Sequence, residues 1–208
     1  MKKRYIISGI FFLLFITMTI LMFTNNAKVF DDTIYNFIFS FRSNFLDILF
    51  KSITKFGNTI TIIILVILLV IFLERKSMWK LLIVVISTVL INQLLKHTIR
   101  RIRPDHIRLI EEGGFSFPSG HSMISIGLYG TLIYLVYKYI KNKLIKTIII
   151  VLLSIIILGI GISRIYLGVH YPSDVLAGYF ISTAIIVLTI SIINDHFRGN
   201  KNDKDSSK

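Results

Sequence analysis

Residues 147–163 read TIIIVLLSIIILGIGIS, and residues 164–174 continue directly with RIYLGVHYPSD. The first stretch has no charged side chain and is nearly long enough to cross the hydrocarbon of a bilayer. The second stretch places an arginine, a histidine and an aspartate just beyond it. Ionisable residues at the edge of an apolar span are costly unless they act together. The junction therefore predicts a membrane helix that ends in a functional site.

The composition of the whole chain agrees with a membrane protein. Hydrophobic residues make up 54% of the 208 positions, which is more than in a typical soluble domain. There is no cysteine, so disulfides, thiolate metal sites and cysteine nucleophiles are all excluded. Runs such as IIILVILLVIFL, residues 62–73, have no polar face at helical spacing, as a helix of a soluble bundle would.

Six apolar segments of suitable length recur along the chain. We predict an all-α integral membrane protein, with one six-helix domain over residues 1–196 and a polar cytoplasmic tail over residues 197–208. No small-residue cleavage site follows the first segment, so we expect a retained span rather than a signal peptide. The predicted transmembrane helices lie near residues 5–23, 57–73, 78–95, 121–139, 146–163 and 173–194.

The basic residues set the expected orientation. The formal net charge is +13, and an inside N-terminus puts more lysine and arginine in the inside segments than in the outside ones. We therefore expect a multi-pass protein of the plasma membrane with both termini cytoplasmic, and loops 96–121 and 163–174 extracytoplasmic. Because the charge is spread over both faces, a nucleic-acid partner is not expected. No obligate protein partner is evident either.

Residues 31–56, between the first two predicted spans, alternate apolar and charged positions at helical spacing. One interpretation is a short amphipathic helical segment, of one or two helices, lying at the outer membrane interface. The other is an apolar face packed against neighbouring spans. The sequence favours neither.

Three polar clusters interrupt the apolar background, and the predicted topology puts all of them on one side of the membrane. The first is KHTIRRIRP, residues 96–104, where Lys96 and Arg103 are about two helical turns apart and can point to one side. For Arg100, Arg101 and Arg108 we expect contacts with lipid headgroups instead.

The second cluster is FPSGHS, residues 117–122, immediately before a predicted span. Ser119 is a suitable helix N-cap, and Gly120 permits close approach of the backbone to a ligand. Free N–H groups at a helix start form an anion site, and His121 stands beside them.

The third cluster holds His170 and Asp174 on either side of Pro172, which suits the first turn of a helix. The Asp174 carboxylate can then accept a hydrogen bond from one imidazole nitrogen and leave the other free as a nucleophile.

Together the clusters suit phosphoryl transfer. Lys96, Arg103 and Arg164 can neutralise phosphate oxygens, while Ser119 and Gly120 add hydrogen-bond donors. His170 can attack phosphorus, held in the right tautomer by Asp174, and His121 can protonate the leaving oxygen and then activate water. No acidic cluster suggests a metal, so we expect neither a metal nor another cofactor.

The spacing of these motifs resembles the three-part signature of the type 2 phosphatidic acid phosphatase superfamily. The matching residues are Lys96, Arg103 and Pro104; Pro118, Ser119, Gly120 and His121; and Ser163, Arg164, His170 and Asp174. The resemblance implies a helical membrane enzyme with an extracytoplasmic, metal-independent site and the residue roles given above. The chain is also similar to bacterial phosphatidylglycerophosphate and undecaprenyl pyrophosphate phosphatases.

The expected activity is hydrolysis of a terminal phosphate from a membrane lipid through a phosphohistidine intermediate. Phosphatidylglycerophosphate, undecaprenyl pyrophosphate and phosphatidic acid all present such a group. The alternative is a membrane protein that binds or transports an anion without hydrolysing it. That alternative would require polar residues deep within several spans, and the sequence has only scattered ones, such as Asn92 and Gln93.

Overall fold

The computed structural model describes the backbone of residues 2–206 and the side chains of residues 2–196. Over this range the regular structure is helical throughout, which confirms the predicted all-α class. In chain order the elements are α1 (Lys2–Phe23), α2 (Lys28–Ser40), α3 (Asn44–Ile53), the 3-10 turn η1 (Thr54–Gly57), α4 (Thr59–Phe72), α5 (Arg75–Ile99), α6 (Gly120–Ser125), the π-helical turn η2 (Ile126–Gly130), α7 (Thr131–Tyr139), α8 (Lys143–Tyr166) and α9 (Pro172–Ser206).

Four helices in the described part of the chain are long and apolar enough to cross a membrane: α1, α5, α8 and residues Pro172–His196 of α9. A fifth candidate is the pair formed by Asn44–Gly57 and α4, which bends by 50° at its break. The predicted span at 121–139 takes a different form, because α6, η2 and α7 follow one another from Gly120 to Tyr139 with a π-helical turn between them. These lengths describe a multi-pass membrane protein.

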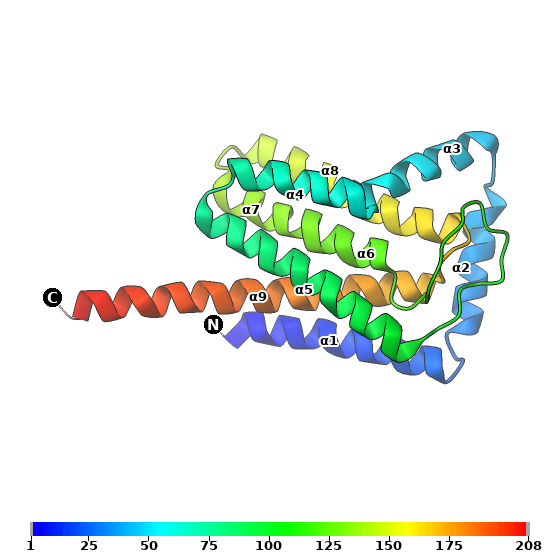
Figure 1. Cartoon of the computed structure of the whole chain (residues 1–208), viewed down its shortest axis with the longest axis horizontal. Coiled ribbons are helices and arrows are strands. Elements are labelled where there is room, and N and C mark those ends of the chain that lie inside the picture. The colour runs from blue at the N-terminus through cyan, green and yellow to red at the C-terminus, as the bar shows by residue number, and fades with distance from the viewer. Residues whose placement is uncertain (1, 207–208) are drawn as a thin grey trace.

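Helix α9 runs through the middle of the bundle, with α1 antiparallel along one side of it (Figure 1). The Ser8 hydroxyl donates to the Ala184 carbonyl at 2.9 Å, and the Tyr5 hydroxyl donates to Asp195 at 3.0 Å. Phe15 of α1 is buried against Phe117, with ring centroids 6.0 Å apart. The first helix is thus an integral part of the core.

The helices α5 and η2 approach closely because of a glycine. A Cβ atom on Gly127 would lie 2.9 Å from Thr88 Oγ1, so only glycine allows the two backbones their present separation. Thr88 itself is fully buried, and its hydroxyl donates to the Val84 carbonyl at 2.7 Å. The π-helical turn therefore lies at a close contact between α5 and the helix that begins at Gly120.

The segment over residues 31–56 forms two helices and the turn η1. Helix α2 crosses one end of the bundle, beside the long connection between α5 and α6 (Figure 1). Its Tyr35 is buried and stacks on His106 of that connection, with ring centroids 3.7 Å apart. Helix α3 exposes Phe45 and Ile48 but packs Phe50 on Tyr166. For α2, then, one face is packed against the rest of the protein.

The two ends of the bundle are formed by different segments of the chain. The start of α1 and the C-terminal part of α9 lie at one end, whereas α2 and the connection over residues 100–119 cover the other (Figure 1). All three polar clusters singled out in the sequence come to the covered end.

We predict that Gly127→Ala destabilises the bundle by about 1–3 kcal/mol, because the new methyl group would overpack the contact with Thr88. The midpoint of thermal unfolding of the purified protein in detergent measures the loss. Gly9→Ala is the matched control, since nothing lies within 4 Å of a Cβ at Gly9 on α1. Equal stability of the two variants would contradict the packing argument.

Candidate active site

His170 lies between a guanidinium and a carboxylate. Arg103 Nη1 is 3.2 Å from His170 Nε2 and donates to the Val169 carbonyl at 2.8 Å. On the other side of the ring, His170 Nδ1 is 3.3 Å from Asp174 Oδ2. The side chains of His170 and Asp174 are 1% and 0% exposed, so this contact is shielded from water.

A tight turn between α8 and α9 fixes the position of this histidine. Gly168 has a φ of +73°, and the backbone N–H of His170 donates to the Arg164 carbonyl at 3.2 Å. A side chain at Gly168 would overlap the carbonyl of Ile107. Because Leu109 also donates to the Leu167 carbonyl at 3.1 Å, the connection over residues 100–119 is tied directly to the turn.

The surroundings of His170 keep its imidazole neutral. Burial lowers the pKa of His170 well below its ordinary value, and the positive charges of Arg164, Arg103 and Lys96 lower it further. With Asp174 next to Nδ1, the proton of the neutral ring belongs on Nδ1. The lone pair of Nε2 then faces the guanidinium of Arg103, whose Nη1 lies 3.2 Å away.

Arg101 holds the Asp174 carboxylate from behind. It donates to Asp174 Oδ1, to the Ser173 hydroxyl at 2.7 Å and to Asp31 Oδ2 at 2.8 Å. Asp31, on α2, also accepts from the Ser173 backbone N–H at 2.8 Å. The expectation that Arg101 contacts lipid headgroups is therefore wrong, because two buried carboxylates need its charge inside the protein.

A further carboxylate, that of Glu112, lies near both Arg103 and Arg164. Arg164 donates to Glu112 and, at 2.8 Å, to the Thr54 hydroxyl, while Arg103 Nη2 lies 3.7 Å from Glu112. Burial alone would raise the pKa of Glu112, but the charge and hydrogen bond of Arg164 lower it below its ordinary value. The sequence reasoning assigned Glu112 no role.

Arg164 also has an unsatisfied donor. Its side chain is 1% exposed, and its Nε–H has no hydrogen-bond partner in the part of the chain that the structure describes. A buried, unpaired N–H costs free energy comparable to a lost hydrogen bond. An anion oxygen at this point would remove that cost.

The start of α6 presents further donors. Ser119 caps the helix, because its Oγ accepts from the Ser122 backbone N–H at 3.4 Å, and its own N–H donates to the Asp174 carbonyl at 3.1 Å. Within residues 2–206, the backbone N–H groups of Gly120 and His121 have no partner. The sequence was right about the cap, but the Ser119 hydroxyl is buried and already paired.

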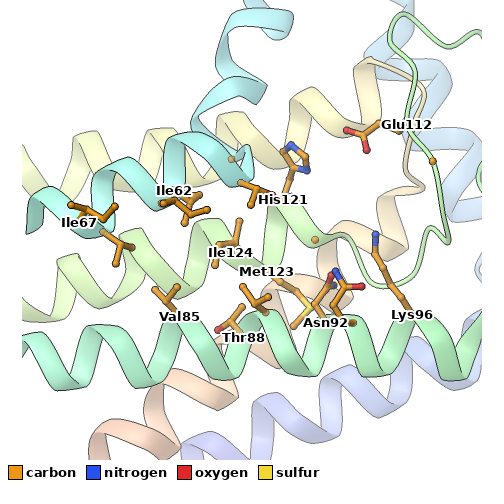
Figure 2. Close-up of a pocket in the computed structure, with 18 of the residues that line it drawn as sticks. Ile62, Ile67, Val85, Thr88, Asn92, Lys96, Glu112, His121, Met123 and Ile124 are labelled. Atoms are coloured by element: carbon orange, nitrogen blue, oxygen red, sulfur yellow. The ribbon is translucent and has the colours of Figure 1, made fainter. Parts of the chain in front are cut away.

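The His121 side chain, at the start of α6, lies beside the N-terminal end of α4. Its Nε2 lies 2.7 Å from the Asn58 side-chain oxygen, a partner that the sequence did not suggest. Figure 2 shows His121, Lys96 and Glu112 around one opening, each coming from a different segment. The six charged or catalytic side chains predicted from the sequence are thus gathered at this end of the bundle, namely Lys96, Arg103, His121, Arg164, His170 and Asp174.

A cavity of about 580 Å³ extends from this opening between α4, α5 and α6. Lys96, Arg103, Glu112 and His121 line one end of it. Its other end is apolar, and Figure 2 shows Ile62, Ile67 and Val85 there. Among the described residues, no three His, Asp or Glu side chains gather as a metal site.

Comparison with known proteins identifies the class. The model of the PAP2 superfamily matches residues 77–198, more than half of the chain, so the chain belongs to the PAP2 superfamily. This confirms the resemblance seen in the three motifs. The protein is accordingly an enzyme, a phosphatase.

Individual relatives agree with that assignment. Phosphatidylglycerophosphatase B of Bacillus subtilis is 31% identical over 185 residues, which are 85% of this chain and 90% of the relative. A Lipid A 1-phosphatase of Rhizobium johnstonii is 32% identical over 118 residues, 51% of this chain and 43% of that protein.

Solved structures show the same architecture. The crystal structure of a transmembrane PAP2 type phosphatidylglycerolphosphate phosphatase from Bacillus subtilis has a TM-score of 0.82 and 30% identity, covering 90% of this chain and 96% of that one. Aquifex aeolicus LpxE shares the fold, with a TM-score of 0.65 and 22% identity over 78% of this chain and 95% of that one.

We predict that Arg101→Leu destabilises the protein by about 3–5 kcal/mol, because it leaves Asp31 and Asp174 buried without a counter-charge. Thermal unfolding in detergent measures this. Arg100→Leu is the control, since Arg100 is exposed and, among the described residues, its side chain bonds only the carbonyl of His97. Adding Asp31→Asn to Arg101→Leu should restore part of the stability; no restoration would contradict the charge argument.

Proposed function

We propose that this protein is a membrane lipid phosphatase that removes a terminal phosphate from a lipid through a phosphohistidine intermediate. The main support for this proposal is the distribution of polarity along the cavity, which has Lys96 and Arg103 at one end and mostly apolar side chains along the rest of its length. A lipid phosphate has the same distribution of polarity. The similarity to phosphatidylglycerophosphatase B supports phosphatidylglycerophosphate as the first substrate to test, with lipid A phosphate second.

The cationic end provides the donors that a phosphate group requires. Arg103, Arg164 and Lys96 neutralise the nonbridging oxygens, and the free Nε–H of Arg164 is already oriented by the bonds of its other nitrogens. The unpaired backbone N–H groups of Gly120 and His121 add to these donors. Phosphate would replace the Glu112 carboxylate as the partner of the two guanidinium groups.

The chemistry then proceeds on the two histidines. The Nε2 lone pair of His170 attacks phosphorus, a new N–P bond forms, and the bond from phosphorus to the lipid oxygen breaks. Asp174 stabilises the proton on Nδ1 as the ring gains positive charge. His121 gives a proton to the leaving oxygen and then takes one from the water that hydrolyses the N–P bond. Asn58 orients the His121 ring.

The apolar part of the cavity accommodates the lipid tails. Its lining residues Ile63, Ile67 and Val89 are 52%, 57% and 44% exposed. In a bilayer, these side chains on α4 and α5 face hydrocarbon, so acyl chains can stay in the membrane while the headgroup reaches the cations. This arrangement explains why a phosphatase site lies at the end of membrane helices.

For the topology, we propose six spans with both termini cytoplasmic and the active site extracytoplasmic. The helical run from Gly120 to Tyr139 would supply one span and α4, extended by the bent α3–η1 segment, another. Alone, α4 is roughly 21 Å long, which is short for about 30 Å of hydrocarbon. Residues 197–208 would then form the cytoplasmic tail.

A panel of lipids tests the activity directly. We predict that the purified protein, in mixed micelles with a chelator, releases phosphate from phosphatidylglycerophosphate and that His170→Ala lowers the rate by at least about 1,000-fold. His97→Ala, at an exposed histidine near the end of α5, is the matched control and should keep the wild-type rate. Undecaprenyl pyrophosphate, phosphatidic acid and lipid A 1-phosphate complete the panel. Anion binding with no turnover on any of these lipids would favour the transport or binding alternative.

The charges around His170 predict a shifted pH profile. Because burial and three cations lower the pKa of His170, the neutral nucleophile persists below the ordinary histidine value of about 6.5. The acid limb of kcat/KM should therefore lie below that pH. Lys96→Met removes one of the cations, so the pKa of His170 rises and the limb moves to higher pH. Lys141→Met, an exposed lysine at the other end of the bundle, should leave the limb in place.

A further inference from the structure

A second basic cavity lies at the opposite end of the bundle from the active site. Its volume is about 580 Å³, and it is lined by Arg4, Lys76, Lys80, Tyr134, Tyr137, Lys138, Tyr139 and Asn194. Lys80 and Lys96 are both on α5, and the rise of a helix places them roughly 24 Å apart. The phosphatase reaction therefore gives this cavity no role.

Two of its lysines gather on one aromatic ring. The Nζ of Lys80 lies 5.6 Å from the centroid of the Tyr134 ring, and the Nζ of Lys138 lies 5.9 Å from the same centroid. Lys138 is also 5.0 Å from the ring of Tyr139. The Asn194 amide donates to the Tyr134 hydroxyl at 3.2 Å and so anchors the ring on α9.

Lys80 is buried without an acidic partner. It is 3% exposed, and among the described side chains neither Lys80 nor Lys138 forms an ion pair with a carboxylate. Burying an ammonium group beside another cation is costly unless an anion accompanies them. Basic residues also set the orientation of a membrane protein, but that role does not require a buried lysine. Exposed lysines such as Lys141 and Lys143 serve it equally well.

The exposed aromatic residues around the cavity indicate that the anion belongs to a lipid headgroup. Tyr137 on the rim is 68% exposed, and Trp79, next to Lys80 in the sequence, is 47% exposed. Exposed tyrosine and tryptophan near the ends of membrane helices are typical of the headgroup level of a bilayer. A group bound between these lysines would thus be at the depth of lipid phosphates.

We propose that this cavity binds the phosphate group of an anionic phospholipid from the leaflet at the N-terminal end of the bundle. Lys80 and Lys138 supply the charge, and Tyr134 holds the two ammonium groups in place. The bound lipid is not hydrolysed there, because the described residues that line the cavity include no histidine and no carboxylate. It is a lipid-binding site separate from the catalytic one.

The test compares two charge-matched double variants of the full chain. Lys80→Gln/Lys138→Gln removes the proposed ligands, and Lys141→Gln/Lys143→Gln removes two exposed lysines at the same end. Each protein, delipidated in zwitterionic detergent, is titrated with phosphatidylglycerol, and bound lipid is counted by native mass spectrometry. We expect the first variant to bind roughly 30-fold more weakly than wild type, and the second to bind like wild type. Equal affinity of the two variants would overturn the proposal.

Three further arms keep the result interpretable. Lys96→Met, changed only at the active-site end, should bind phosphatidylglycerol like wild type; a comparable loss there would place the lipid in the catalytic cavity and overturn the proposal. If inorganic phosphate stabilises wild type as strongly as the lipid does, and Lys80→Gln/Lys138→Gln loses that stabilisation, the site takes a free anion and the lipid assignment is wrong. If the first double variant does not fold, Lys138→Gln alone is used, because Lys138 is exposed; it should weaken binding roughly fivefold, and unchanged binding counts against the site.

Discussion

The arrangement of the candidate active site depends on one largely buried guanidinium, that of Arg101, whose side chain is 15% exposed. Arg101 joins Asp31 of α2 to Asp174 of α9, and Asp174 in turn contacts His170. Both carboxylates are at most 1% exposed, so neither would be tolerated as an anion without this partner. The same charge that stabilises the fold therefore also orients the proposed nucleophile. Structure and chemistry are linked here through a residue outside the recognised motif positions.

Much of the site could be predicted because its residues have fixed spacing and unusual surroundings. Lys96, Arg103, Arg164 and His170 stand out as ionisable residues at the ends of apolar runs, where such side chains are costly. Their proximity in space required only that the loops emerge on one side. The all-α class followed from the same apolar runs, since only helices satisfy their own backbone groups in lipid.

The partners of these residues could not be predicted in the same way. Asp31 precedes Arg101 by 70 residues, and Asn58 precedes His121 by 63. Glu112 lies in a connection without helical periodicity, so nothing in its local sequence indicates a contact with Arg164. Likewise, the π-helical turn η2 contains Gly127, which lies against Thr88 of α5 in a tertiary contact. Hydrophobic periodicity carries no information about such pairings.

The turn at Gly168 has a mechanical consequence. The backbone of Ile107 lies where any side chain at Gly168 would have to go, and Leu109 bonds to Leu167 beside it. The segment that carries Arg103 and the segment that carries His170 are therefore held together by these two contacts. A displacement of the connection over residues 100–119 would therefore carry the His170 turn with it, which favours a constant distance between the His170 ring and the Arg103 guanidinium.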